Sequence, residues 1–158
     1  MQSRMNSPVM IVPEAMPALQ SLAQALFASA DQSDLPRKTL FLAYLRTSQI
    51  NGDSVCVDLH SRNAQNAGAT TEQVIAVAAW RESIQFNDGE RAALALAEEI
   101  ARIHDQADPV PDGVYDEAAR QYGEQALATL IAGIATANMW NRFNVATRQI
   151  VNPAPASR

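Results

Sequence analysis

The chain has 158 residues, 47% of them hydrophobic and 18% charged, which is enough for one core and short for two domains. The net charge of −5, with no run of Lys or Arg, argues against partners such as nucleic acid or an acidic membrane. One cysteine excludes an intrachain disulfide framework, and no apolar run has the length of a signal peptide or a membrane span. We therefore expect a cytoplasmic protein.

The first half of the chain begins without a helical pattern and then becomes helical. Residues 1–12 lack helical periodicity and are expected to form an extended N-terminal arm. Leucines and Phe27 then recur at helical spacing until a polar, proline-containing break over residues 31–36. A second helix is predicted over about residues 37–49. Its run Leu40–Leu45 is apolar on all sides, which is typical of a helix buried in a core or in a subunit interface.

The next predicted helix carries the only cysteine and one of the two histidines. Asn51-Gly52 is a turn dipeptide, and Asp53 suits the N-cap of the helix that follows. Cys56 and His60 then lie one turn apart on one face, within reach of a thiol–imidazole hydrogen bond. The first turn of a helix favours a thiolate, with His60 either as its base or as the imidazolium that stabilises the sulfur anion. The Asp53 carboxylate acts the other way, because a negative neighbour raises a thiol pKa and favours a buried structural cysteine.

Capping boxes mark the starts of two later helices. A Thr70–Gln73 box predicts a short helix that ends at Trp80, and an Asn87–Glu90 box predicts a helix over residues 89–104. His104, at the end of that helix, is expected to act as a surface cap.

The remaining elements complete an all-helical pattern. Asp112 is expected to cap a helix over residues 113–122, and the longest helix follows Gly123. Residues 152–158 are expected to be a disordered tail. We therefore predict an all-α single domain over residues 13–151, a bundle of about six to seven helices with no strands.

Polar and aromatic residues interrupt the apolar face of the last helix. Asn138 and Asn141 need hydrogen-bond partners if they are buried, either the backbone or each other across a subunit contact. Trp140 is expected to anchor the core or an interface, or to shape access to a pocket around Cys56.

The cysteine segment carries a family likeness. Residues 45–60 read Leu-Arg-Thr-Ser-Gln-Ile-Asn-Gly-Asp-Ser-Val-Cys-Val-Asp-Leu-His. This resembles the core of the AhpD-like alkylhydroperoxidases of the carboxymuconolactone decarboxylase superfamily, which typically reads Leu-Arg-x-Ser-Gln-Ile-Asn-Gly-Cys-x-Tyr-Cys-x-x-x-His. The likeness continues over residues 79–83, 90–98 and 138–145. Four blocks in one order are more specific than a lone motif. The resemblance implies all-helical subunits that assemble into homo-trimers or homo-hexamers.

Two positions depart from the family pattern. Asp53 stands where the family has the first cysteine of its Cys-x-x-Cys pair, so the disulfide of the usual redox cycle cannot form in this chain. Phe41 stands where the family commonly carries a glutamate of a proton relay to the histidine. The resemblance therefore carries over only Cys56 and His60 as catalytic residues. In the family the matching cysteine is the one proposed to meet the peroxide.

Three functions remain open. The first is a thiol-dependent peroxidase, in which a small hydroperoxide oxidises Cys56, His60 acts as base and an external thiol is the reductant. The second is a member that binds a small organic molecule, or acts on a lactone by acid–base chemistry, while Cys56 only packs. The third is a catalytically inactive oligomeric scaffold. No cofactor and no metal are expected, because the chain has no phosphate-binding loop and its two histidines are far apart in sequence.

Overall fold

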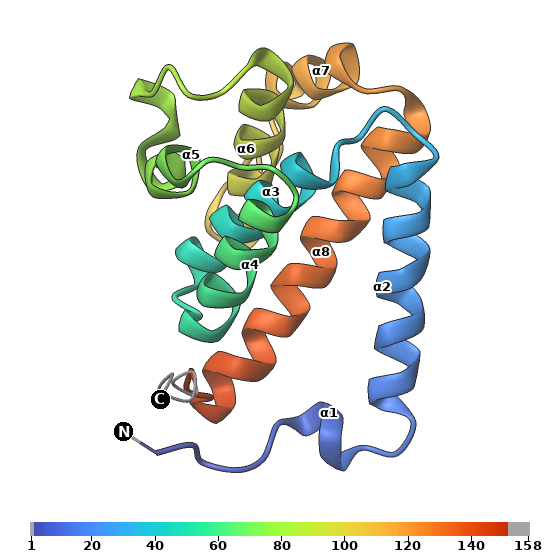
Figure 1. The fold of residues 1–158 in the computed structure, drawn as a ribbon, viewed down its shortest axis with the longest axis vertical. Coiled ribbons are helices and arrows are strands. Elements are labelled where there is room, and N and C mark those ends of the chain that lie inside the picture. The colour runs from blue at the N-terminus through green and yellow to red at the C-terminus, as the bar shows by residue number, and fades with distance from the viewer. Residues whose placement is uncertain (1, 152–158) are drawn as a thin grey trace.

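The computed structural model describes residues 2–151, and the regular elements of this part of the chain are all helical (Figure 1). They are α1 (Pro8–Ile11), α2 (Ala15–Asp31), α3 (Arg37–Asn51), α4 (Ser54–Asn66), α5 (Thr71–Ala76), the 3-10 segment η1 (Val77–Glu82), α6 (Asp88–Ala101), the 3-10 segment η2 (Ile103–Asp105), α7 (Asp112–Gln121) and α8 (Glu124–Thr147). The predicted all-α fold is confirmed. None of the described helices has the length and hydropathy of a membrane span.

The number of helices exceeds the six to seven that the sequence predicted. The additional one is α1, a single turn over Pro8–Ile11 in the segment expected to be extended. Pro8 occupies its first position, where a proline is tolerated because that backbone N–H has no partner within the helix. Residues 152–158, the predicted tail, lie outside the described residues.

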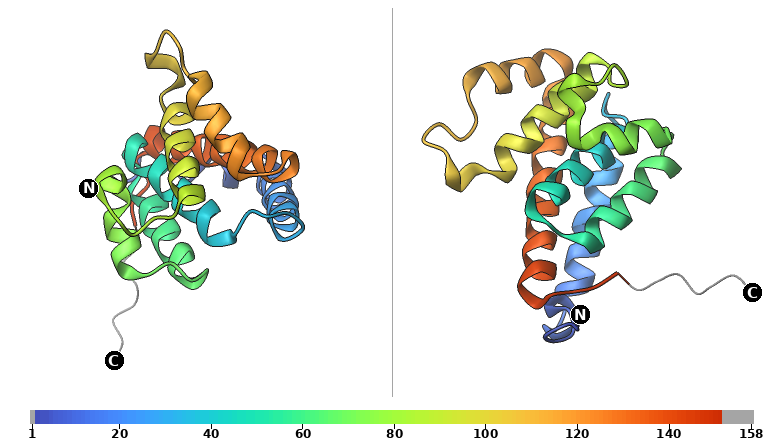
Figure 2. Two further views of the ribbon diagram at one scale, coloured as in Figure 1. Left: turned by 90° about the horizontal axis from the view of Figure 1, so that it is seen from above. Right: turned by 90° about the vertical axis from the view of Figure 1, so that its left-hand side faces the viewer.

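Helix α3 lies at the centre of the bundle and packs against α4, α6 and α8 (Figure 2). Its segment Leu40–Leu45 is buried on all sides, as its apolar character predicted. Helix α2 runs along the outer side of α8, and the N-terminal segment passes beneath both (Figure 1). There the backbone N–H of Arg4 donates to the carbonyl of Thr147 at 2.9 Å. The arrangement places the start of α4 against the C-terminal half of α8.

The two predicted capping boxes are present. The backbone N–H of Gln73 donates to the Thr70 hydroxyl at 3.1 Å, and that of Glu90 donates to the Asn87 side chain at 2.8 Å. Short-range side-chain chemistry therefore fixed both helix starts.

The ends of these two helices were predicted less well. Helix α5 ends at Ala76, and η1 contains a non-helical residue, Ala79, with φ −127° and ψ 36°. In this conformation the buried Trp80 indole donates to Glu98 at 3.1 Å, a tertiary contact that the helical pattern did not include. Helix α6 likewise ends at Ala101, before the predicted end at residue 104.

The predicted N-cap Asp112 is wrong by one position. Pro111 is the capping residue, without a side-chain hydrogen bond, and Asp112 is the first residue of α7. An acidic residue in the first turn still suits the helix dipole.

Candidate active site

The site begins at the turn between α3 and α4. Gly52 ends α3 in the left-handed conformation, with φ 69°, which glycine adopts without strain. Asp53 then caps α4, because one carboxylate oxygen accepts from the backbone N–H groups of Val55 at 3.1 Å and Cys56 at 3.2 Å. The predicted N-cap is confirmed. Its side chain is buried, so Asp53 supports the helix from inside the protein.

The second carboxylate oxygen of Asp53 contacts two asparagines of α8. It accepts from the amide of Asn141 at 3.0 Å and from that of Asn144 at 2.9 Å. The Asn144 amide also donates to Sγ of Cys56 at 3.4 Å. Because a side-chain amide has two N–H donors, Asn144 bridges the carboxylate and the sulfur. Asn144 was not predicted as a site residue, although Asn138, Asn141 and Asn144 recur at a three-residue spacing along one helix face.

The other asparagines of α8 also find partners within the chain. The Asn51 amide donates to the side-chain oxygens of Asn138 at 2.8 Å and Asn141 at 2.9 Å. The Asn141 amide donates further to Ser48, and that of Asn138 donates to the backbone carbonyl of Ile134 at 3.3 Å. The prediction of a backbone partner for Asn138 is confirmed. Asn51, which the sequence analysis treated only as a turn residue, joins α3 to α8.

Cys56 is buried, with 4% of its surface exposed. Burial raises the pKa of its thiol to about 12, and the Asp53 carboxylate acts in the same direction. The Asn144 and Asn141 amides oppose this shift of the pKa and are outweighed. The resting thiol is therefore protonated at neutral pH. The expectation that the first turn favours a thiolate is wrong for this state, because desolvation exceeds the effect of the helix N-terminus.

His60 is also uncharged at neutral pH. Burial lowers its pKa to about 4, although the negative charge of Asp53 acts in the opposite direction. The Nδ1 atom is buried and has no hydrogen-bond partner among the described residues. No hydrogen bond joins the side chains of Cys56 and His60, so the predicted bond between them is absent, and the sulfur instead accepts from Asn144. The imidazole instead packs edge-on against Tyr44, with ring centroids 5.2 Å apart.

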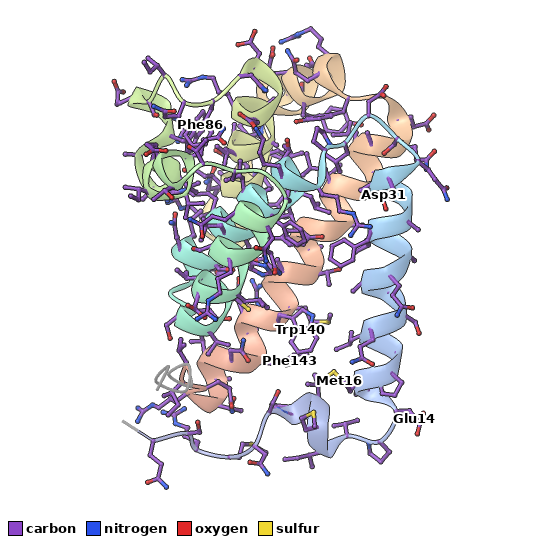
Figure 3. The ribbon with its side chains drawn as sticks, viewed as in Figure 1. Glu14, Met16, Asp31, Phe86, Trp140 and Phe143 are labelled. Atoms are coloured by element: carbon purple, nitrogen blue, oxygen red, sulfur yellow. The ribbon has the colours of Figure 1, made fainter. Side chains whose placement is uncertain are left out.

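A cavity of about 390 Å³ lies between α2, α3, α4 and α8, and both predicted catalytic residues line it. Its lining residues are Ala23, Leu26, Phe27, Phe41, Tyr44, Val55, Cys56, Leu59, His60, Asn63, Thr136, Ala137, Trp140 and Asn144. Figure 3 shows Trp140 on the side of α8 that faces α2, in agreement with its predicted place beside the Cys56 pocket. Phe41 contributes a wall of the cavity, whereas Asp53 lies outside the lining. His104 is not part of the lining.

The arrangement combines a nucleophilic atom, a possible base and an apolar chamber. The thiol and the imidazole open on the same cavity, and an amide donor is fixed on the sulfur. Within residues 2–151 no group of three or more His, Cys, Asp or Glu side chains is placed to hold a metal ion. The thiol and the imidazole on this cavity can carry out nucleophilic attack by sulfur and proton transfer by imidazole.

Comparison with protein families gives a match to the carboxymuconolactone decarboxylase family over residues 13–99. The chain is 32% identical over 136 residues to the uncharacterized protein YdfG of Bacillus subtilis, covering 86% of this chain and 88% of that protein. It is 33% identical over 105 residues to the uncharacterized protein YnjA of Escherichia coli, covering 66% of this chain and 56% of YnjA.

Solved structures with the same fold include proteins of different described activity. One is a protein of unknown function from Agrobacterium tumefaciens, proposed to be the antioxidant defence protein AhpD. Its TM-score is 0.86 at 25% identity, covering 97% of this chain and all of that one. Another is the debrominase Bmp8 without ligand, with a TM-score of 0.77 at 25% identity, covering 89% of this chain and 73% of Bmp8. A cysteine-to-alanine variant of Bmp8 in complex with 2,3,4-tribromopyrrole has a TM-score of 0.79 at 24% identity, covering 92% and 74%.

Proposed function

The chain belongs to the carboxymuconolactone decarboxylase family, and we propose that within it the protein is an AhpD-type thiol peroxidase. In this proposal Cys56 reduces a small organic hydroperoxide and His60 acts as the base. The observation that carries it is the placement of both side chains on one apolar cavity. The fold shared with the Agrobacterium protein proposed to be AhpD supports it.

The first half of the reaction consumes the hydroperoxide. Because the resting thiol is protonated, its proton has to leave as the sulfur attacks. The neutral His60 imidazole is the acceptor for this proton, and it passes the proton on to the leaving alkoxide. Sγ of Cys56 bonds to the distal oxygen and the O–O bond breaks. The products are an alcohol and a Cys56 sulfenic acid, so sulfur is oxidised and the peroxide is reduced.

Asn144 assists this step by its position on the sulfur. Its amide N–H stays directed at Sγ and stabilises the negative charge that develops there during attack. Asp53 holds the amide in place through the second N–H of Asn144. The Asp53 carboxylate also raises the pKa of the Cys56 thiol. It therefore orients the Asn144 amide but lowers the fraction of thiolate in the resting protein.

The second half of the reaction requires thiols from outside the chain, because Cys56 is the only cysteine. One thiol attacks the sulfenic sulfur and releases water, which leaves a mixed disulfide on Cys56. A second thiol attacks this disulfide, releases an external disulfide and restores the Cys56 thiol. Such a cycle suits a compartment that keeps thiols reduced, such as the cytoplasm.

The test is hydroperoxide consumption by the purified full chain with dithiothreitol as reductant. Dimedone trapping and mass spectrometry report sulfenic acid at Cys56. We expect Cys56→Ser to abolish both signals and His60→Ala to lower the rate at least tenfold. His104→Ala, a change of the other histidine, is the matched control and keeps the rate. The proposal would be contradicted if the unmodified protein consumed hydroperoxide no faster than Cys56→Ser and formed no dimedone adduct.

A second candidate function is binding of a small apolar molecule without redox chemistry. It is favoured by the protonation states, because neither Cys56 nor His60 is charged at neutral pH. Bmp8 carries a different activity on the same fold, so the fold alone does not fix the chemistry. This function would be supported if a small apolar molecule bound saturably to the protein while Cys56 stayed unoxidised in the dimedone experiment.

We also infer that the protein assembles as a homo-trimer or homo-hexamer. Large apolar side chains are exposed on the described chain, among them Ile84 at 96%, Ile75 at 74% and Met10 at 67%. Light scattering with size-exclusion chromatography tests this inference, and a monomer at micromolar concentration would contradict it. An oligomer with neither peroxidase activity nor a ligand would point to the scaffold function.

A further inference from the structure

The cavity beside Cys56 has an unbroken wall of rings. Phe27 and Phe41 have centroids 5.6 Å apart at 55°, Phe41 and Tyr44 lie 6.0 Å apart at 83°, and Tyr44 and His60 lie 5.2 Å apart at 65°. These tilted and edge-on contacts are the geometries that aromatic rings favour. Trp140 adds a ring from α8. A planar apolar molecule would therefore find aromatic surface on more than one side.

The same cavity offers no charged partner. No Lys, Arg, Asp or Glu lines it, and the pKa of His60, lowered to about 4, leaves that side chain neutral. Arg37 lies over the Phe27 ring at 4.7 Å but is paired with Asp31 at 2.5 Å. A carboxylate that entered would lose its hydration without gaining a cation, which is unfavourable. The cavity is thus a poor site for the anionic substrate class after which the family is named.

One polar requirement remains inside this apolar chamber. The Nδ1 atom of His60 is buried and has no hydrogen-bond partner among the residues that the structure describes, and an unpaired buried polar atom is unfavourable. A neutral imidazole has one donor and one acceptor nitrogen. A hydroxyl or hydroperoxyl group both donates and accepts, so it matches either tautomer.

We infer that the cavity selects a neutral aromatic molecule that carries one hydroxyl or hydroperoxyl group, with the ring against Phe41 and Trp140 and the polar group at His60. This deepens the proposed function, because the peroxidase substrate would then be an uncharged aryl-alkyl hydroperoxide. Phe41 has a specific role in it. By the family resemblance this position would carry a glutamate that relays protons. The Phe41 ring instead forms part of the cavity wall, against which the ligand would pack.

Binding is tested with compounds that contain no peroxide, so that the result does not depend on turnover. Calorimetric titration of the full chain at pH 7.5 compares 2-phenylpropan-2-ol with its 4-carboxylate derivative, which differs by one charge. We expect the neutral alcohol to bind and the carboxylate to bind at least tenfold more weakly. Isopropylbenzene, which lacks the hydroxyl, is expected to bind several-fold more weakly than the alcohol.

Variants at Phe41 test whether its ring is responsible for binding of the aromatic alcohol. Phe41→Leu keeps the site apolar and is expected to weaken binding of the alcohol several-fold. Phe41→Glu is expected to abolish it, while Asn66→Glu places the same charge at an exposed position of α4 outside the cavity lining and leaves binding unchanged. Circular dichroism verifies that each variant is folded, and Phe41→Leu keeps the test valid if Phe41→Glu does not fold.

The outcomes separate this inference from the proposed function. Equal or tighter binding of the carboxylate, or no binding of the alcohol at millimolar concentration, would overturn the inference even if the protein consumes hydroperoxides. Selective binding of the alcohol by a protein without peroxidase activity would support the inference and overturn the proposed reaction.

Discussion

At one end of the site the buried Asp53 carboxylate accepts four hydrogen bonds, whereas at the other end the buried Nδ1 of His60 has no hydrogen-bond partner within residues 2–151. The Asp53 carboxylate is held by backbone and asparagine N–H groups. The His60 imidazole packs edge-on against Tyr44, which in turn packs edge-on against Phe41. Asp53 and Phe41 are the two positions at which the family resemblance predicts a departure from the AhpD pattern.

The comparison shows that the two ends of one site satisfy their polar groups differently. A carboxylate at the helix start is compatible with the fold because donors from α4 and α8 converge on it. The aromatic side chains near His60 need no hydrogen-bond donors. The cavity beside them is open to a ligand, which can bond to the unsatisfied Nδ1 atom of His60. The Asp53 end is therefore expected to govern stability and sulfur chemistry, and the His60 end to govern recognition.

The largest effect is expected in the reactivity of the thiol between the two ends. With a Cys56 pKa of about 12, the thiolate fraction at pH 8 is about a thousandfold below that of a free cysteine. Alkylation by iodoacetamide should therefore still accelerate about tenfold per pH unit between pH 8 and 10. Asn144→Ala should slow it further, because the variant loses the donor on the sulfur. A plateau in rate below pH 9 would contradict the picture of a protonated resting thiol.

Removal of the carboxylate is expected to have the largest effect on stability. Asp53→Ala removes an N-cap and leaves buried Asn141 and Asn144 donors without this acceptor, so we expect a loss of about 3–5 kcal/mol. Urea unfolding at fixed protein concentration measures it. Asp58→Ala on the same helix, which breaks only an exposed pair with Arg62, should change stability by less than about 0.5 kcal/mol. Equal effects of the two variants would show that the amide network does not stabilise the fold.

The burial of His60 should make stability depend on pH in a defined window. The folded-state pKa of His60 is about 4, below the unfolded value of 6.5, so the unfolded chain binds more protons between these values. Stability should fall by about 3 kcal/mol as the pH is lowered from 6.5 to 4. Urea midpoints across this range measure the decrease. His60→Gln should flatten it, whereas His104→Ala should retain it.

A smaller effect is expected where α8 approaches the aromatic wall. A Cβ at Gly133 would lie 2.9 Å from a Tyr44 ring carbon and 3.0 Å from a Leu40 methyl group. Gly133→Ala should therefore cost about 1–3 kcal/mol through overpacking. Gly113→Ala in α7 meets nothing within 4 Å and should be neutral or slightly stabilising. Thermal unfolding of these two variants separates the effect of packing from that of helix propensity. If Gly133→Ala were as stable as the unmodified protein, the Tyr44 and Leu40 side chains would have to move aside at little cost in free energy.

Local signals in the sequence predicted much of the fold. The Thr70 and Asn87 capping boxes and the Asp53 N-cap depend on residues within one helical turn, so they could be identified from spacing. The end of α5 and the conformation of Ala79 could not, because the contact between Trp80 and Glu98 joins different elements. Helix ends were predicted less well than helix starts for this reason.

The candidate site divides in the same way. Cys56 and His60 were identified from the family pattern, and the structure places both on one cavity. Asn144 was missed because it lies 88 residues from Cys56 in sequence, although its spacing from Asn141 was a usable signal. The protonation states of Cys56 and His60 could not be predicted from the sequence either. Helix geometry favours a thiolate at Cys56, and only the burial of the site shows that desolvation prevails.

The sequence by itself determined the all-helical fold class, three of the four predicted N-caps, the family and the pair of residues Cys56 and His60. These properties depend on residue types and short spacings, which are explicit in the chain. The tertiary structure decided that Asn144 contacts the sulfur, that Phe41 forms a wall of the cavity and that Nδ1 of His60 has no hydrogen-bond partner in the described part of the chain. Each of these depends on where α8 and α3 lie against α4. Solvent exclusion and long-range contacts arise only from packing, so no local pattern specifies them.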